Sequence, residues 1–332
     1  MVNADFEIRR SLLVGETADV YLQRTLTILR NEGVNPVVAL EFSPRRAGIF
    51  CGITEVRGLL SRVLPESGIE VWALSEGDPI DAGEVALRVK APYSSVGLYE
   101  TAISGILAQC TGFASAAREC VDAAKGTPVL ALGARHVHPD VAGILGYSAV
   151  VGGCVSCSTI QGARLAGITP SGNMPHSLSL LLGGTVQAME ALDKHMPQEV
   201  PRVALVDTFR DEGEEALAVS RALREKLRGI RINTPSTRGG ATPDLIKEVR
   251  ARLDLSGFRH VEIMVSGGLN PERITEFVEA EAPVNTFGIG AYIAATGPNP
   301  FHVDIHEVDG RPIARRGRIP GITNNPRLGR VM

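Results

Sequence analysis

The chain has few cysteines and no long hydrophobic run among its 332 residues. Five cysteines do not make a disulfide framework in a chain of this size. No apolar segment approaches the roughly 20 residues that a membrane-spanning helix needs. The N-terminal residues include acids and arginines and lack the apolar core of a signal peptide. We therefore expect a cytoplasmic globular protein, long enough for two domains with cores of their own.

The chain also lacks an excess of either charge. It carries 34 basic and 37 acidic residues, for a formal net charge of −3, and has no basic stripe or acidic tail. This balance argues against nucleic acid or an anionic membrane surface as the main partner. Cys154 and Cys157 form a CxxC without a second pair, so the pattern favours small buried residues over a structural zinc site. We predict no metal site built from protein ligands alone.

Residues 1–98 have the pattern of an α+β domain. Helical spacing and short apolar runs predict a sheet with one helical face. The predicted helices are Thr17–Asn31 and Ile53–Leu64, and the predicted strands are Val37–Phe42, Glu70–Leu74 and Glu84–Lys90. We expect the basic, proline-rich tail, residues 300–332, to pack back on this domain.

Residues 99–299 change to a regular alternation of strand, loop and helix. Short apolar strands that alternate with helices predict a parallel sheet, either an open doubly wound sheet or an incomplete barrel. Polar motifs follow nearly every strand instead of gathering at one switch point, which favours the barrel. The candidate strands are Val129–Gly133, Ala149–Gly152, Ile168–Ser171, Val203–Val206, Gly229–Ile232, Val261–Val265 and Val284–Phe287.

Two glycine-containing stretches follow the last two strands. They are Ser266-Gly267-Gly268 and Gly288-Ile289-Gly290. Glycine lets backbone N–H groups approach a ligand closely, and the start of a helix favours negative charge. Phosphate sites on α/β barrels are built from the loops after the last strands. The pair of stretches therefore predicts a phosphate site, with tight turns as the alternative.

Charged side chains follow several of the other strands. Arg135 suits a bidentate grip on phosphate or carboxylate, or else a salt bridge at the barrel rim. We interpret the neighbouring His136 as solvated or substrate-facing. Asp207 can hold ribose hydroxyls or a magnesium ion, or else cap the next helix, which Asp211 could do equally well. Arg231 is a second candidate for binding an anion.

Two further polar residues complete the set at the strand ends. His176 lies near the start of an apolar helix, where the helix dipole favours an attached phosphoryl group, and a buried structural histidine is the alternative. Asn233 follows Arg231 and can hydrogen-bond hydroxyl groups. Arginines, one acid, a histidine and two glycine turns together fit a small, multiply anionic substrate whose leaving group is also anionic.

These motifs, in this order, resemble the nicotinate phosphoribosyltransferase family, particularly its shorter microbial branch. The resemblance runs over nearly the whole chain, and the motifs are specific only when taken together. They are Gly15-Glu16-Thr17-Ala18-Asp19-Val20-Tyr21, Glu76-Gly77-Asp78, Ala134-Arg135, Gly152-Gly153-Cys154, Met174-Pro175-His176, Val206-Asp207-Thr208-Phe209, Thr234-Pro235-Ser236, Ser266-Gly267-Gly268 and Phe287-Gly288-Ile289-Gly290.

The resemblance implies an α/β fold in which an N-terminal open-faced α/β sandwich precedes an irregular seven-stranded α/β barrel. It also implies a head-to-tail homodimer or higher homo-oligomer whose sites borrow residues from the partner. The reaction would join nicotinate to 5-phosphoribosyl 1-pyrophosphate and release pyrophosphate, in NAD salvage. Mg²⁺ would be the cofactor and ATP a further co-substrate, because His176 matches the histidine that ATP phosphorylates in many members.

The resemblance also gives residues their roles. Tyr21 would stack on the pyridine ring, Arg231 would hold the nicotinate carboxylate, and the glycine stretches would hold the 5-phosphate. We assign catalytic roles to His176, Asp207 and Arg135. The predicted substrate-binding residues are Tyr21, Arg135, His136, Asn173, Arg231, Asn233, Ser266, Gly267, Gly268, Gly288, Gly290 and Ala291.

Four positions depart from the family's pattern, and each lacks a polar group or charge that is usual there. They are Val155, Asn173, Asn233 and Ala291. The departures leave two alternatives open. One is a quinolinate phosphoribosyltransferase on the same architecture, which would need more basic residues for a second carboxylate. The other is a catalytically impaired paralogue that binds a nucleotide or metabolite. The sequence does not decide which base is used or whether ATP is hydrolysed.

Overall fold

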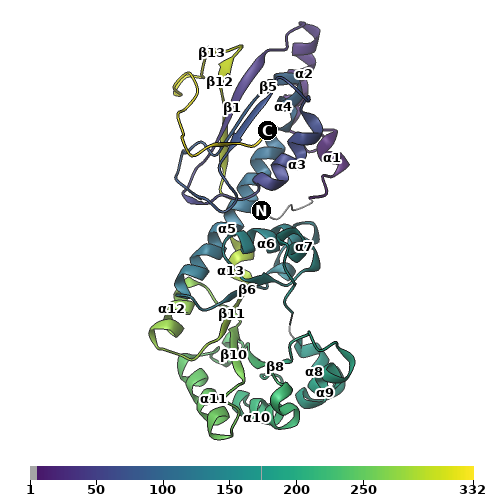
Figure 1. Cartoon of the computed structure of the whole chain (residues 1–332), viewed down its shortest axis with the longest axis vertical. Helices are drawn as coiled ribbons and strands as arrows, with labels where there is room; N and C mark the ends of the chain where they lie inside the picture. The colour runs from purple at the N-terminus through teal and green to yellow at the C-terminus, as the bar shows by residue number, and fades with distance from the viewer. Residues whose placement is uncertain (1–5, 173) are drawn as a thin grey trace. The chain divides into compact units, whose positions relative to one another are not determined.

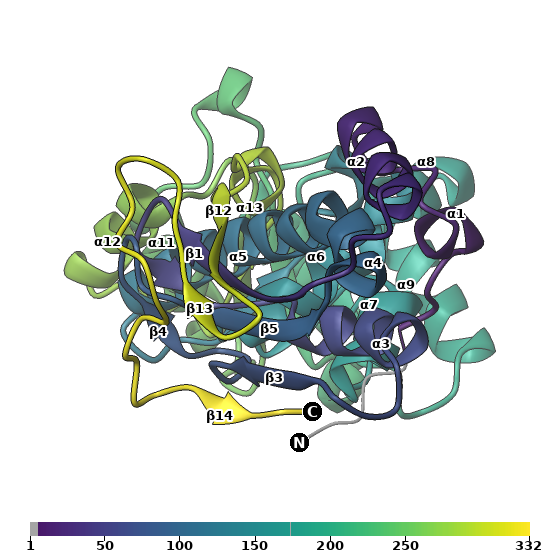
Figure 2. The same cartoon turned by 90° about the horizontal axis from the view of Figure 1, so that it is seen from above.

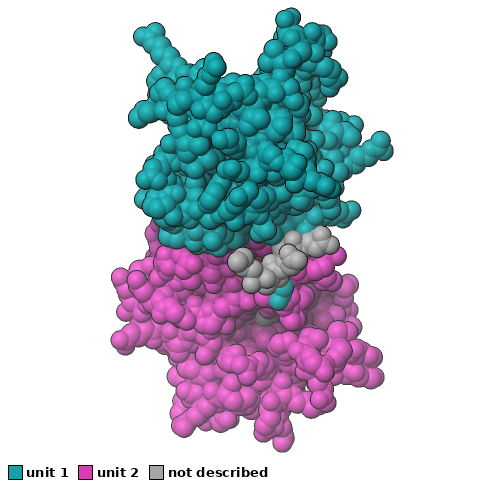
Figure 3. All heavy atoms as spheres, turned by 45° about the horizontal axis from the view of Figure 1, so that its top comes forward, with its two compact units in different colours: residues 1–115, 165–167, 296–332 teal, residues 116–164, 168–295 magenta. Residues whose placement is uncertain are grey.

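The computed structural model describes residues 6–172 and 174–332, and the chain divides into two compact units. Figure 3 shows unit 1 in teal and unit 2 in magenta. Unit 1 contains the chain up to Ser115 together with Leu165–Gly167 and Thr296–Met332, and unit 2 contains Ala116–Arg164 and Ile168–Ala295. Each unit has its own sheet.

Unit 1 is built on a six-stranded sheet in the order β13-β12-β1-β5-β3-β14, whose pairs are antiparallel. Its strands are β1 (Val37–Pro44), β3 (Glu70–Ala73), β5 (Leu87–Pro92), β12 (Phe301–Val308), β13 (Arg311–Pro312) and β14 (Gly329–Arg330), with β2 (Gly48–Ile49) and β4 (Pro79–Ile80) as a separate pair. Its helical segments are α1 (Arg10–Leu13), α2 (Val20–Asn31), α3 (Ile53–Val63), α4 (Tyr93–Val96) and η1 (Gly97–Tyr99).

The C-terminal tail contributes three of these strands. β12 pairs along the length of β1, from Val38 opposite Val308 to Pro44 opposite Phe301. In Figure 2 the yellow strand β14 lies at the edge of the sheet beside β3. Val38 and Val308, which are 270 positions apart, are therefore neighbours in one sheet.

Unit 2 is built on a six-stranded parallel sheet in the order β7-β6-β11-β10-β9-β8. Its strands are β6 (Val129–Ala131), β7 (Ser156–Cys157), β8 (Val203–Leu205), β9 (Gly229–Ile232), β10 (Glu262–Ser266) and β11 (Thr286–Ile289). In Figure 1 the helices α10 to α12 lie outside the curled sheet. The helical segments are α5 (Glu100–Ala123, which contains the boundary between the units), η2 (Ala134–His136), α6 (Pro139–Val151), α7 (Ile160–Ala166), α8 (His176–Leu182), α9 (Thr185–His195), α10 (Glu212–Leu223), η3 (Arg224–Lys226), η4 (Ser236–Arg238), α11 (Pro243–Leu255), α12 (Pro271–Glu279) and α13 (Ala291–Ala295).

The prediction of a seven-stranded barrel is wrong in its strand count, because the sheet has six strands among the described residues. Ala149–Gly152, predicted as a strand, lies at the end of α6. The apolar residues of this helix are not confined to one face, and such a run cannot be told from a buried strand by periodicity. The two-residue strand β7 follows it instead.

Ile168–Ser171 was also predicted as a strand and is irregular in the structure. One backbone hydrogen bond joins it to β7, from Ser171 N–H to the Cys157 carbonyl at 2.9 Å. Pro170 has no N–H to donate, so a regular ladder cannot form here. The curled sheet therefore remains a partial barrel with β7 and β8 at its two edges.

The described residues contain no helix with the length and apolar character needed to cross a bilayer. All five cysteines are free and buried. Burial raises the pKa of the Cys120 and Cys154 thiols to about 12. These thiols are therefore poor nucleophiles at neutral pH.

Candidate functional site

A chain of hydrogen bonds joins the carboxyl ends of β8, β9 and β10. The Asn233 backbone N–H donates to Asp207 Oδ2 at 2.8 Å, and the Ser266 hydroxyl donates to Asn233 Oδ1 at 2.9 Å. Arg231 Nε in turn donates to Ser266 Oγ at 2.7 Å. Four predicted site residues from three neighbouring strands thus lie together, as the edge of a parallel sheet allows.

Asp207 follows β8, and its side chain is fully buried. Burial raises the pKa of its carboxyl group, with a further contribution from Glu212, while His176 and the Asn233 amide oppose the rise. Its Oδ1 atom has no hydrogen-bond partner among the described residues. Asp207 does not cap α10, because the Asp211 side chain accepts the N–H groups of Gly213 and Glu214 there. A buried acceptor is thus available to a ligand hydroxyl or cation.

His176 is the first residue of α8, and its side chain is 40% exposed. Its Nδ1 lies 3.0 Å from Thr208 Oγ1, and its Nε2 lies 3.6 Å from Asp207 Oδ1. The Thr208 contact fixes the plane of the ring. The imidazole is therefore partly open to solvent and is oriented by the loop after β8, so it is not a buried structural histidine.

Arg231 lies within β9, where burial lowers the pKa of its guanidinium. Asp207 opposes this shift, and the positive charge of Arg135 adds to it. Within the described part of the chain the guanidinium makes no hydrogen bond beyond the one from Nε to Ser266. Its terminal nitrogens can therefore bind an anion in a fork.

Gly267 and Gly268 form the turn after β10, with φ angles of +92° and +63°. Both are solvent-exposed, and α12 begins three residues later with Asn270 as its cap. A Cβ atom on Gly267 would lie 2.9 Å from Asn233 Oδ1. The left-handed backbone and the close neighbour both require glycine, and two such residues in succession can aim N–H groups at an anion.

The second glycine stretch has a different structure. Gly288 is buried inside β11, where a Cβ atom would lie 2.6 Å from Met264 Cε, so close packing accounts for this glycine. Gly290 is at the strand end, where a Cβ atom would lie 3.5 Å from His136 Nε2. Ala291 begins α13 and is exposed.

Arg135 and His136 form the short η2 segment after β6, and both are exposed. Arg135 makes no ion pair with any described residue, so a rim salt bridge does not account for it. His138 caps α6 by accepting the Asp140 N–H. Of the four departures, Val155 is 55% exposed and Asn233 is in the hydrogen-bonded chain, whereas Asn173 lies outside the described residues.

Tyr21 belongs to unit 1. It lies on α2 with 62% of its surface exposed, and its hydroxyl donates to Asp19 Oδ2 at 3.4 Å. It lines a hollow of about 600 Å³ in that unit. A core aromatic would be buried, so a core role does not account for this residue.

Several residues near the site were not predicted. They are Thr185, Thr208, Glu212, Glu215 and Thr234. Thr208 and Thr234 belong to the motifs that follow β8 and β9, and Thr185 is the first residue of α9. The two glutamates are part of an acidic helix start that normally faces solvent. No sequence signal marks them as buried.

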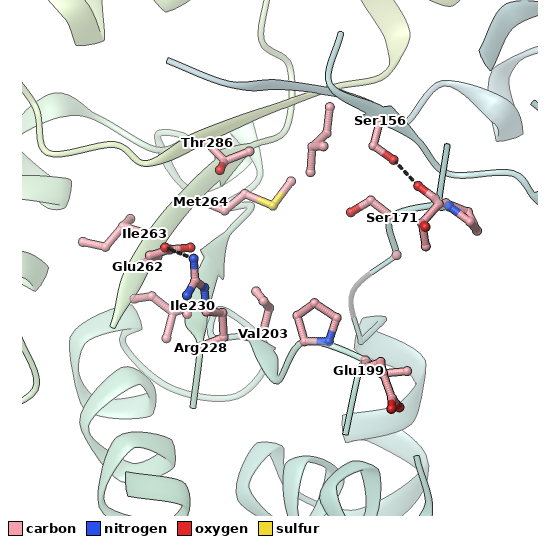
Figure 4. Close-up of a pocket in the computed structure, with 17 residues that line it drawn as sticks. Ser156, Ser171, Glu199, Val203, Arg228, Ile230, Glu262, Ile263, Met264 and Thr286 are labelled. Atoms are coloured by element: carbon pink, nitrogen blue, oxygen red, sulfur yellow. Dashed lines mark hydrogen bonds and ion pairs between the residues drawn. The ribbon is translucent and has the colours of Figure 1, made fainter. Parts of the chain in front are cut away.

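A cavity of about 590 Å³ lies elsewhere in unit 2. Its lining includes the amino-terminal parts of β8 to β11, such as Val203, Gly229 and Glu262. In Figure 4 Met264 points into it, and the Arg228–Glu262 ion pair lies at one side. The predicted catalytic residues are not part of this lining.

Comparisons with known proteins extend over both units. The sequence matches the model of the quinolinate phosphoribosyl transferase N-terminal domain over residues 19–111 and that of the C-terminal domain over residues 113–304. It is 32% identical over 234 residues to nicotinate phosphoribosyltransferase pncB2 of Mycobacterium tuberculosis, covering 70% of this chain and 49% of the relative. It is 26% identical to nicotinate phosphoribosyltransferase of Bacillus subtilis, covering 69% of this chain and 46% of the relative. The chain therefore spans about half the length of these curated relatives.

Solved structures are also similar to this chain over most of its length. Nicotinate-nucleotide pyrophosphorylase from Pyrococcus furiosus is similar with a TM-score of 0.87 and 38% identity, covering 97% of this chain and 82% of that one. Human nicotinic acid phosphoribosyltransferase is similar in fold, with a TM-score of 0.74 at 20% identity, covering 92% of this chain and 77% of that one.

Proposed function

Because the chain belongs to the quinolinate phosphoribosyltransferase family, we propose that it transfers a phosphoribosyl group from 5-phosphoribosyl 1-pyrophosphate to nicotinate in NAD salvage. The products are the mononucleotide and pyrophosphate. Curated relatives at 26–32% identity carry the name nicotinate phosphoribosyltransferase, which supports this choice of base. We also propose that the chain belongs to the shorter microbial branch of the nicotinate phosphoribosyltransferases.

Arg231 carries the proposal. It is a partly buried guanidinium whose Nε is held by Ser266 and whose terminal nitrogens are free of described partners. A planar guanidinium matches a carboxylate in a bidentate pair. We assign it to the nicotinate carboxylate, with the turn at Gly267 and Gly268 assigned to the 5-phosphate.

The reaction develops positive charge on the ribose and negative charge on pyrophosphate, so positioning and charge stabilisation supply most of the rate. Asp207 Oδ1 is a buried acceptor that no described residue hydrogen-bonds, and it fits either a ribose hydroxyl or Mg²⁺. When bound, Mg²⁺ would neutralise charge on the pyrophosphate oxygens. His176 and Arg135 are assigned to the pyrophosphate side, and ATP coupling through His176 is part of the proposal.

A product assay tests this function. The purified protein is incubated with phosphoribosyl pyrophosphate, Mg²⁺ and one base from a panel of pyridines, with and without ATP, and products are identified by mass. We expect nicotinate mononucleotide, and a higher yield with ATP. Absence of product with every base, in a folded protein that still binds phosphoribosyl pyrophosphate, would instead favour the impaired paralogue.

Quinolinate is the second candidate base. The positive charge of Arg135 lowers the pKa of the Arg231 guanidinium, and a base with two carboxylates would need a second cationic group of this kind. The same assay separates the two bases by comparing kcat/KM for nicotinate and quinolinate.

We also propose a dimer in which Tyr21 completes the partner's site. Tyr21 is exposed on α2 beside other exposed apolar residues, Val20 and Ile28 among them. Exposed apolar surface of this kind marks a protein interface.

A further inference from the structure

The helix that follows β8, α10, starts with an acidic turn, Asp211-Glu212-Gly213-Glu214-Glu215. Acids at a helix start are usually solvated. Here Glu212 and Glu215 are each only 4% exposed. They are three residues apart and so share one face of α10. A buried carboxylate needs hydrogen-bond partners, so the groups that donate to it show which segments of the chain it fixes in place.

Glu215 holds the loop after β8. Its Oε2 accepts the Thr208 backbone N–H and its Oε1 accepts the Phe209 N–H, both at 3.2 Å. Oε1 also accepts the Thr185 hydroxyl at 3.2 Å. One carboxylate thus binds two consecutive amides immediately after Asp207.

Glu212 holds the loop after β9. Its Oε1 accepts the Thr234 hydroxyl at 2.7 Å, and Thr234 is 5% exposed. Thr234 follows Asn233, whose own N–H donates to Asp207. The two loops that one helix turn holds are therefore also joined to each other.

We propose that Glu212 and Glu215 are positioning residues that fix the loops after β8 and β9 relative to each other. They thereby orient His176 and Asp207 for phosphoribosyl transfer. The path to His176 is short. Glu215 fixes the backbone of Thr208, and the Thr208 hydroxyl contacts His176 Nδ1 at 3.0 Å. The catalytic part of this inference rests on the proposed function. The orientation of His176 does not.

The experiment compares Glu215→Ala, Glu215→Gln and Glu212→Gln with the control Asp193→Asn. Asp193 also accepts from a buried basic residue, Arg202, but at the amino end of β8. The free energy of unfolding, kcat, KM for phosphoribosyl pyrophosphate and the NMR signals of the His176 ring are measured on the full chain. His176→Gln assigns the ring signals.

We expect Glu215→Ala to shift the His176 ring signals and to lower kcat by about a hundredfold, as a small misplacement of reacting groups does. KM for phosphoribosyl pyrophosphate should change by less than about threefold, because Glu215 does not contact the turn at Gly267 and Gly268 that is assigned to the 5-phosphate. Glu215→Gln keeps an acceptor oxygen and should recover most of kcat. Thr208→Val should reproduce the shift of the ring signals. Asp193→Asn should lower stability without moving the ring signals.

The proposal is overturned if Glu215→Ala leaves both the ring signals and kcat as they are in Asp193→Asn, while stability falls. A wild-type protein that makes no product with any base refutes the proposed function. In that case the His176 signals in Glu215→Ala still decide whether the carboxylate orients the ring.

Discussion

At the scale of single residues, the site depends on where one guanidinium is placed. Arg231 lies inside β9, and Arg228 lies just before the same strand in an ion pair with Glu262. The two arginines are three positions apart, yet Arg228 is 65% exposed and lines the cavity at the amino ends of the strands. Arg228→Ala is therefore a control for the removal of an arginine that lies outside the site.

We expect Arg231→Ala to lower kcat/KM for nicotinate by about two orders of magnitude or more, because a desolvated charge pair contributes roughly 2–5 kcal/mol. The Kd for phosphoribosyl pyrophosphate, measured by calorimetry, should change by less than threefold. Arg228→Ala should change neither. Equal losses for both ligands in Arg231→Ala would place this residue outside the base pocket.

The partly buried carboxyl group of Glu55 in unit 1 predicts that the stability of the protein depends on pH. Burial raises the pKa of its carboxyl group to about 7, with Glu76 adding to the shift and Arg9 opposing it. The unfolded chain has a glutamate pKa of roughly 4.3. Between these values the folded state binds the proton that the unfolded state has lost, so stability falls as the pH rises through this window.

Glu55→Gln removes this titration. We expect its free energy of unfolding in urea to fall less between pH 5 and pH 8 than that of the wild type, and to exceed the wild-type value at pH 8 by about 1–2 kcal/mol. The exposed Glu66→Gln serves as the control. Parallel pH curves for Glu55→Gln and the wild type would show that Glu55 is charged in the folded state.

At the scale of elements, the turn between β10 and α12 combines backbone strain with a close contact. Gly267 has a φ of +92° and a Cβ atom there would meet Asn233, whereas Gly257 has a φ of +86° with no neighbour within 4 Å. Gly257 lies after α11, so it reports the cost of the left-handed backbone alone.

We expect Gly257→Ala to lose about 1–2 kcal/mol of stability, the usual cost of a side chain in this conformation. Gly267→Ala should lose more, because its Cβ atom would also meet Asn233. Gly267→Ala alone should weaken binding of phosphoribosyl pyrophosphate, by about tenfold, because its amide leaves the position that faces the anion. Unfolding curves and calorimetry give the two quantities. Unchanged affinity in Gly267→Ala would remove this turn from the phosphate site.

At the scale of the whole molecule, the proposed dimer predicts complementation between subunits. Tyr21 belongs to unit 1, and Arg231 belongs to unit 2. If each site takes Tyr21 from one subunit and Arg231 from the other, a mixed dimer of Tyr21→Ala and Arg231→Ala has one intact site. After subunit exchange the mixture should regain up to about one quarter of wild-type activity, since roughly half the dimers are mixed.

The matched control mixes Arg231→Ala with His176→Ala. Both residues lie in unit 2, so every site in that mixed dimer lacks one group and no activity should return. Sedimentation should show a dimer for each variant. A monomer, or recovery that is equal in both mixtures, contradicts the proposed sharing of sites.

Local patterns in the sequence were enough to predict several strands and the group of residues at their ends. Short apolar runs between turns identified β1, β8, β9 and β10 within a residue or two, because strand burial and loop chemistry are local. Strand-end residues such as Asp207, Asn233 and Arg231 were predicted together, since parallel strands end at a common edge. The same ordered motifs indicated a phosphoribosyltransferase.

Other features depend on contacts between segments that are far apart in the sequence. Whether Ala149 lies in a helix or a strand depends on what packs around an apolar run. Whether Ile168–Ser171 forms a strand depends on its pairing with β7, which is limited to one backbone hydrogen bond. A Cβ atom on Gly288 would meet Met264, Leu132 and Ser266, which come from other segments of the chain. The partners of Glu212 and Glu215 lie in the loops after β8 and β9 and at the start of α9. Sequence patterns would expose these acids to solvent at the helix start. In the structure they are buried and connect the loops of the site.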